Sequence, residues 1–186
     1  PNGTILITDT IDIDVEKISI ECNALILCDM SKEKYALRFG NTGDYNGRYN
    51  KGRTLYKGLF LRCVNTDINL RSNAILFTGT METAGSSNIT FENCVIQDFN
   101  NGLTYADRSY FIRMNNSDLY GNVTQINIIG GVDTGENIKF TNCAIANGGT
   151  ALECDNSLST VYFNGCSIDY NYNRIFNIKK GIVFVD

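Results

Sequence analysis

Five copies of one short pattern run through this chain. The copies are Leu61–Ile68, Ile89–Ile96, Ile112–Leu119, Ile138–Ile145 and Val161–Ile168. Each reads apolar, variable, apolar, variable, then Asn or Gly, then a small residue, a variable residue and an apolar residue. Alternation of this kind is typical of β-strands, because successive side chains of a strand point to opposite faces. The pattern therefore predicts two short strands that meet at a corner.

The fifth position of each copy is the expected corner. A sharp bend between two strands needs a residue in the left-handed conformation, which Gly adopts freely and Asn tolerates well. The predicted bend residues are Asn65, Asn93, Asn116, Asn142 and Gly165. Aligned on them, the inward positions before the bend are Cys63, Phe91, Met114, Phe140 and Phe163, the small residues after it are Thr66, Cys94, Ser117, Cys143 and Cys166, and the next apolar column is Ile68, Ile96, Leu119, Ile145 and Ile168.

A third strand is expected in the same register. Ten residues after each bend lies an apolar residue, and these are Ile75, Leu103, Ile126, Leu152 and Ile175. Units of about two dozen residues, each with three short strands and like residues stacked on like, indicate an all-β parallel β-helix. A leucine-rich repeat fits less well, because no segment between the strands has the 3.6-residue period of a helix.

Both ends of the chain continue the repeat. Upstream, Leu25, Leu27 and Phe39 match inward columns, and Asp29 matches a bend, while Asn2–Val15 alternates as an opening rung would. Downstream, Ile182, Phe184 and Asp186 begin a further copy, with Asp186 at its bend. We therefore expect residues 1–186 to form a single β-helix domain that is a fragment of a longer chain, since a solenoid normally caps its last rung.

Charge and cysteine usage limit the partners and the compartment. The net charge of −4 without a basic cluster argues against nucleic acid as a ligand. No apolar run approaches the length of a membrane span, so membrane insertion is not expected. The seven cysteines include no CxxC motif, and several fall in inward columns where Cys packs as a small hydrophobe. We expect free thiols and folding in a reducing compartment such as a bacterial cytoplasm.

Carboxylates are the main candidates for chemistry. The chain has no His, which excludes Ser-His and Cys-His schemes and His-ligated metals, and no cofactor or metal site is predicted. One position past the third-strand column, an outward column is expected from Leu76, Thr104, Asn127, Glu153 and Phe176. Glu153 and Asp155, with Asp133 and Asp107 in loops of lower rungs, form a candidate acid–base cluster of the kind that glycosidases use. The alternative is that these residues solubilise the wall or cap turns.

Tyrosines are candidates for sugar binding. The chain has ten Tyr and no Trp, and a Tyr ring offers an apolar face to a sugar and a hydroxyl to its polar edge. The candidate residues are Tyr105, Tyr120, Tyr170 and Tyr172. Exposed aromatic side chains can equally form a subunit interface.

The repeats also carry a resemblance to a known group of proteins. The opening GTILITDTIDIDV at Gly3–Val15 and the rungs NITFENCVI and NIKFTNCAI at Asn88–Ile96 and Asn137–Ile145 are similar to segments of the pectate-lyase-like superfamily of right-handed parallel β-helices. Within it, the chain most resembles bacteriophage tailspike and appendage proteins. The calcium-binding Asp cluster and Arg base of pectate lyases have no match here, and the catalytic residues of tailspike hydrolases do not transfer to positions of this sequence.

The resemblance implies a homotrimer that binds a bacterial surface polysaccharide. Two functions from different classes follow. The first is a virion module, located outside cells after folding, that binds the host polysaccharide during adsorption. The alternative is a polysaccharide depolymerase, either a glycoside hydrolase or a lyase. A shared fold does not decide between them, because function depends on the site.

Overall fold

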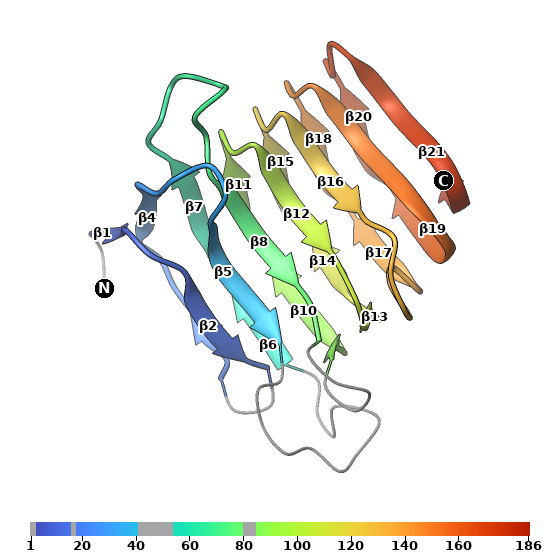
Figure 1. The fold of residues 1–186 in the computed structure, drawn as a ribbon, viewed down its shortest axis with the longest axis horizontal. Coiled ribbons are helices and arrows are strands. Elements are labelled where there is room, and N and C mark those ends of the chain that lie inside the picture. Colours follow the sequence, from blue (N-terminus) through green and yellow to red (C-terminus); the bar gives the residue numbers. More distant parts are fainter. Residues whose placement is uncertain (1–2, 16–17, 41–53, 80–84) are drawn as a thin grey trace.

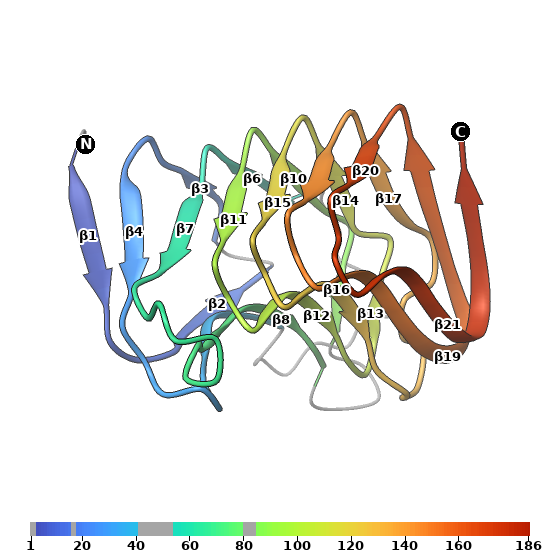
Figure 2. The ribbon, with the colours of Figure 1, turned by 90° about the horizontal axis from the view of Figure 1, so that it is seen from above.

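Alternating apolar residues and left-handed corner residues fold the chain into stacked rungs of three strands (Figure 1). The computed structural model describes residues 3–15, 18–40, 54–79 and 85–186. Within these residues no helix occurs, and every strand pair is parallel. The rungs stack along the long axis, with the two termini at opposite ends (Figure 2). The predicted all-β parallel β-helix is confirmed.

Three faces enclose the core. The first face is a separate sheet of β1 (Thr4–Ile7), β4 (Leu25–Cys28), β7 (Phe60–Cys63), β11 (Val95–Gln97), β15 (Asp118–Tyr120), β18 (Ala144–Ala146) and β20 (Ser167–Asp169). The second face contains β2 (Ile11–Asp14), β5 (Tyr35–Gly40), β8 (Asn73–Phe77), β12 (Asn101–Tyr105) and β16 (Thr124–Ile128). The third contains β3 (Ile20–Glu21), β6 (Thr54–Lys57), β10 (Ile89–Glu92), β14 (Arg113–Asn115) and β17 (Ile138–Thr141).

Two long strands join the second and third faces. The strand β19 (Thr150–Asn164) pairs with β16 along its first part and with β17 along its last part, and β21 (Arg174–Val185) follows β19 through both. The corner between these faces thus disappears in the last two rungs. A small pair, β9 (Ser86–Ser87) and β13 (Ser109–Tyr110), lies at the same corner in earlier rungs.

The first corner behaves as the repeat predicts in four of the five copies. Asn93, Asn116, Asn142 and Gly165 have φ values of 54°, 49°, 52° and 60°. The prediction for Asn65 was wrong, because the left-handed residue of that rung is Gly58, with φ of 69°. The pairing of β6 with β10 and of β7 with β11 shows that the true copy is Thr54–Leu61. The pattern at Leu61–Ile68 matched by chance, since β7 alternates and is followed by a loop that contains Asn65.

The core columns follow the corrected register. Phe91, Met114, Phe140 and Phe163 are register partners and are buried, as predicted, and Tyr56 takes the place assigned to Cys63. Ile96, Leu119 and Ile145 are fully buried partners, and Leu61 replaces Ile68, which is exposed. In the column of residues directly after the bend, Cys94, Ser117 and Cys143 are buried as predicted. Leu59 takes the place in this column that was assigned to Thr66. All seven cysteines are free, and Cys166 is the one that is only partly buried.

In the rungs near the two ends of the chain, the structure differs from several predicted positions. Ile75, Leu103, Ile126 and Leu152 pair in register as predicted, but Phe176 and not Ile175 continues that column. The turn before β21 is therefore one residue longer than the repeat suggested. In the second rung, Ile26 and Cys28 point inward in place of Leu25 and Leu27, which are partly exposed. Asp29 is not among the left-handed residues, whereas Phe39 is fully buried as expected.

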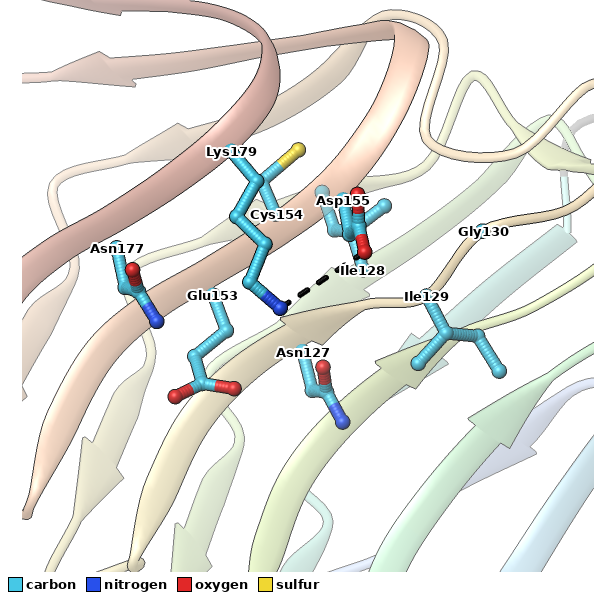
Figure 3. Close-up of a pocket in the computed structure, with 9 residues that line it drawn as sticks. All are labelled: Asn127, Ile128, Ile129, Gly130, Glu153, Cys154, Asp155, Asn177 and Lys179. Carbon is cyan, nitrogen blue, oxygen red and sulfur yellow. Dashed lines mark ion pairs between the residues drawn. The ribbon is translucent and has the colours of Figure 1, made fainter.

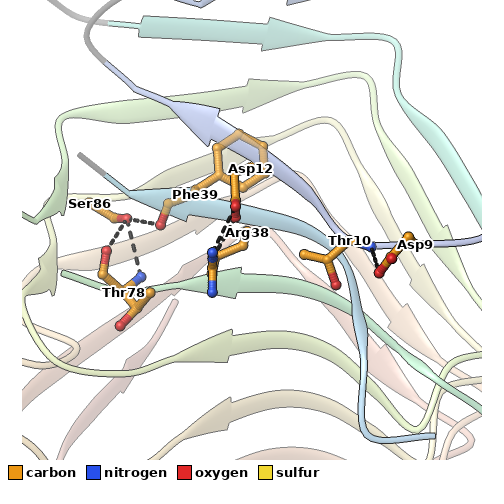
Figure 4. Close-up of polar contacts among 7 residues, drawn as sticks. All are labelled: Asp9, Thr10, Asp12, Arg38, Phe39, Thr78 and Ser86. Carbon is orange, nitrogen blue, oxygen red and sulfur yellow. Dashed lines mark hydrogen bonds and ion pairs between the residues drawn. The ribbon is translucent and has the colours of Figure 1, made fainter. Parts of the chain in front are cut away.

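Polar contacts tie neighbouring rungs together near the start of the second face. Arg38 on β5 donates two hydrogen bonds to Asp12 on β2, from Nε to Oδ1 at 2.5 Å and from Nη2 to Oδ2 at 2.7 Å (Figure 4). The buried Ser86 hydroxyl accepts a hydrogen bond from the Thr78 amide at 3.2 Å and contacts the carbonyl of Phe39. These contacts link rungs through side chains in addition to the backbone ladders.

Candidate functional site

A polar hollow lies on the outer surface of the second face, where its strands run toward the third face. It has a volume of about 290 Å³ and is built from β16, β19 and β21 (Figure 3). Its lining residues are Asn127, Ile128, Ile129, Gly130, Glu153, Cys154, Asp155, Asn177 and Lys179. Outward side chains of three successive strands therefore converge on one site.

Parallel register places a carboxylate between two amides in this hollow. Asn127 on β16 pairs with Glu153 on β19, and Glu153 pairs with Asn177 on β21. Neighbouring strands lie roughly 4.8 Å apart, so the three side chains form a row along the solenoid axis. Carboxylate oxygens accept hydrogen bonds and amides both donate and accept them. The row thus offers both kinds of partner to a ligand rich in hydroxyl groups.

A β-bulge adds a cation to the row. The register of β19 and β21 shifts after Cys154, so Cys154 pairs with Ile178 while Asp155 pairs with Lys180, and Lys179 is the extra residue. Bulges redirect side chains in this way. Lys179 extends over the hollow, with its Nζ 3.8 Å from Asp155 Oδ2 (Figure 3). Lys180 Nζ lies 3.5 Å from Asp155 Oδ1. These side chains are about half exposed or more, so the ion pairs hold them only weakly and leave them available to a ligand.

The structure brings together two of the four predicted carboxylates. Glu153 and Asp155 are separated by one residue on β19 and line the same hollow. Asp107 and Asp133 do not line it. Asp107 Oδ1 accepts a hydrogen bond from the backbone amide of Val132 at 2.9 Å, and Asp133 is an exposed residue with φ of 51°. Both sit in the turn between the second and third faces, where Asp is common for conformational reasons.

The predicted tyrosines lie elsewhere. Tyr105 has 1% of its surface exposed and stacks on Phe77, with ring centroids 4.9 Å apart. Burial also raises the pKa of its hydroxyl above the usual value. The expectation for Tyr105 was therefore wrong, because its ring belongs to the core and no surface ligand can reach it. Tyr120, Tyr170 and Tyr172 are exposed, at the first face or at the turn after it, and none of them lines the hollow.

Sequence reasoning missed Asn177 and Lys179. The outward column was extended to Phe176, which points inward, because the turn before β21 has one residue more than the earlier ones. The segment Arg174–Lys180 contained a signal, since Asn177 is the one uncharged polar residue in an otherwise apolar and basic run. The bulge that aims Lys179 at the hollow has no signature in the repeat pattern.

Comparison of the chain with protein-family models, with curated proteins and with solved structures finds no significant match. Within the described residues, no group of three or more His, Cys, Asp or Glu side chains is arranged to hold a metal ion. The same part of the chain contains no helix long and apolar enough to cross a membrane.

Proposed function

We propose that this chain is a β-helix module that binds a polysaccharide in the hollow around Glu153. The observation that carries the proposal is the row Asn127, Glu153 and Asn177 across three adjacent strands, with Lys179 over it. Hydroxyl groups of sugars donate to carboxylates and accept from amides and ammonium groups, so the row matches their chemistry. A rigid sheet surface holds these groups in place, which limits the entropy lost on binding.

The biological setting in the proposal is that of a bacteriophage tailspike. In that setting the ligand is a host surface polysaccharide, the working form is a homotrimer, and the module acts on the virion outside cells after folding in the bacterial cytoplasm. The resemblance of the NITFENCVI and NIKFTNCAI rungs to phage appendage proteins supports this setting. The rigid stack of rungs suits it, because parallel β-sheet pairing runs from one end of the described chain to the other.

The test is a binding measurement on a panel of purified bacterial surface polysaccharides. At least one polysaccharide should bind the full chain, and Asn177→Ala should weaken its affinity about tenfold, the typical effect of losing a hydrogen bond or two in a site. Lys139→Gln, on the outer surface of the third face, is the matched control and should leave affinity unchanged. Absence of binding to every member of the panel, or equal binding by Asn177→Ala and the wild type, would refute the proposal.

Depolymerisation is the second candidate function. The observation that favours it is the presence of two carboxyl groups, those of Glu153 and Asp155, in one hollow. Glycoside hydrolysis uses such a pair, with one group as general acid and the other as base or nucleophile. Glu153 and Asp155 are the candidates for these two roles.

A further inference from the structure

A second and larger hollow lies near the opposite ends of the strands of the second face. It has a volume of about 670 Å³ and spans the starts of β5, β8 and β12. Its lining includes Lys32, Tyr35, Ile68, Arg71, Asn73 and Asn101. None of these residues takes part in the site around Glu153. The hollow is therefore a separate feature of the molecule.

Arg71 provides a positioned cation in this hollow. Its Nη1 donates a hydrogen bond to the carbonyl of Gly121 at 2.9 Å, which fixes the guanidinium between rungs. Its Nε is buried and has no hydrogen-bond partner within the described part of the chain. Hydrogen bonds from a guanidinium to an anion are charge-assisted and stronger than neutral ones, so the part of Arg71 that lines the hollow can bind an anionic group.

The amide groups beside Arg71 are held in one arrangement. Asn73 Nδ2 donates to the carbonyls of Lys32 and Lys34, at 2.9 and 3.3 Å. Asn73 Oδ1 accepts from Asn100 Nδ2 at 3.2 Å and from Asn101 Nδ2 at 2.7 Å. Asn100 and Asn101 each keep a second amide hydrogen, which can point to a ligand. The hollow thus has fixed donors as well as a fixed cation.

Charge and apolar surface define the ligand class. Lys32 and Arg71 carry positive charge, and Glu33, 82% exposed, lies 3.9 Å from Lys32. On the far side of Arg71, in a smaller hollow, Asp98 is paired with Arg62 at 3.2 Å. The lining of the larger hollow itself carries two cations, Lys32 and Arg71, against one carboxylate, Glu33, in a chain whose net charge is −4. Tyr35, Ile68 and Val123 add an apolar wall.

We propose that this second hollow binds an acidic sugar unit, with its anionic group on Arg71 and Lys32. The sugar ring lies against the apolar wall of Tyr35 and Ile68, and ring hydroxyls accept from Asn100 and Asn101. Arginine forms bidentate, charge-assisted hydrogen bonds with carboxylates, which is the basis of the selectivity for an acidic over a neutral sugar. The inference rests on the proposed polysaccharide-binding function and specifies that the polysaccharide is anionic.

Heteronuclear NMR titration of the full chain tests this inference at the level of single sites. The probes are glucuronate, glucose and acetate, and the signals followed are the backbone amides of Asn100, Asn101 and Arg71. Glucuronate should shift these signals with a dissociation constant at least about fivefold below that of glucose, as a charge-assisted hydrogen bond provides. Acetate alone should bind more weakly than glucuronate, because it lacks the ring and its hydroxyls.

Two variants and a control make the result specific. Lys32→Gln changes a side chain that is 60% exposed, so it should fold normally and weaken glucuronate binding while glucose binding stays the same. Arg71→Lys keeps the positive charge but replaces the planar guanidinium, which forms bidentate hydrogen bonds, with an ammonium group. It should also weaken glucuronate binding. Lys139→Gln removes an equal charge on the third face and should have no effect.

The possible outcomes separate this inference from the proposed function. Equal affinity for glucose and glucuronate, unchanged binding in both variants, or acetate that matches glucuronate would each overturn the acidic-sugar site. If the polysaccharide panel is positive and glucuronate causes no shift near Arg71, the inference fails and the function stands. If the panel is negative and glucuronate binds as described, the hollow stands as a site for acidic sugars and the proposed function fails.

Discussion

At the scale of single residues, left-handed backbone conformations determine where each strand ends. Asn93, Asn116, Asn142 and Gly165 turn the chain from the third face to the first, and Asp98, Gly121, Asn147 and Tyr170 turn it from the first face to the second. Asn142 Nδ2 lies 3.5 Å from Asn116 Oδ1, so the corner amides also stack along the axis. Apart from Tyr170, these corners are built from Asn, Asp and Gly, the residue types that adopt positive φ at the least cost.

The left-handed conformation of Asn116 predicts that two substitutions at this corner differ in their effect on stability. Asn116→Val should lower the free energy of unfolding by about 1–2 kcal/mol, because a β-branched residue is strained at φ of 49°. Asn116→Gly should be nearly neutral, since Gly adopts this conformation readily. Urea unfolding followed by circular dichroism measures both. A Gly variant that is destabilised as much as the Val variant would show that the Asn side chain, and not the backbone, governs stability there.

At the scale of elements, stacking of like residues in adjacent rungs stabilises the core. Phe140 and Phe163 stack with ring centroids 5.2 Å apart and an interplanar angle of 16°, and both are fully buried. Tyr56 and Phe91 stack in the same column at 5.2 Å. Each rung thus buries apolar surface only because its neighbours cover it, as in solenoids generally.

Truncation of this column should be costly. Phe140→Ala should destabilise the protein by roughly 3–5 kcal/mol, the usual cost of removing a buried aromatic side chain. Phe184→Ala is the matched control, because Phe184 stacks on Tyr162 on the outer surface and is 49% exposed. The control should cost much less in the same thermal or urea unfolding experiment. Similar losses in the two variants would contradict the assignment of Phe140 to the core.

Stacking also brings Cys143 and Cys166 together on adjacent rungs. A hydrogen bond from Cys143 lowers the pKa of the Cys166 thiol to about 6, while the same contact and burial raise the pKa of Cys143. Cys166 is only partly buried, whereas Cys94 and Cys143 are buried. Cys166 lies near the last rung, where fewer neighbours cover the small-residue column.

The lowered pKa predicts an unusual pH dependence of alkylation. Thiolate is the reactive form, so Cys166 should react with iodoacetamide at pH 7, and its rate should fall only as the pH drops through about 6. Cys94 and Cys143 should stay protected in the native protein. Mass spectrometry of labelled peptides across pH measures this, with Cys143→Ala as a control that should return the midpoint toward the ordinary thiol value. A wild-type midpoint near that ordinary value would contradict the prediction.

At the scale of the whole molecule, the rungs present polar side chains from separate repeats as one surface. The two hollows lie on the second face, and Asn127 of the first hollow donates to Asn101 Oδ1 of the second at 3.4 Å. An amide network therefore connects the two sites across the face. This arrangement suits a ligand that is a chain and contacts several rungs at once.

Cleavage of a bound glycan would depend on the carboxyl groups of Glu153 and Asp155, and substitution of each group tests it. If cleavage occurs, Glu153→Gln should reduce release of reducing ends about a hundredfold or more and retain binding, because the substitution keeps the shape and removes the ionisable group. Asp155→Asn tests the second carboxyl group in the same assay. Unchanged turnover in both variants would exclude this hollow as the catalytic site. Binding by the wild type without any turnover would instead favour the virion-binding function.

The sequence by itself determined the architecture and much of the core. Strand alternation and Asn at fixed positions are local requirements of a repeated rung, so Asn93, Asn116 and Asn142 and the Phe91, Phe140 and Phe163 column were predictable. Local patterns do not set the length of a turn between rungs. For that reason the copy at Gly58 was misplaced, and Phe176 was assigned to the outer surface.

Only the tertiary structure decided which polar residues meet. Asn122 and Gln125 look like surface residues in the sequence, yet both are fully buried, and Asn122 Nδ2 donates to Gln125 Oε1 at 2.5 Å. Lys179 reaches Asp155 because a bulge redirects its side chain, and Arg71 reaches Gly121 across 50 residues of chain. Such contacts depend on register and on the stacking of distant rungs, whereas the repeat pattern records only the conformation of each rung.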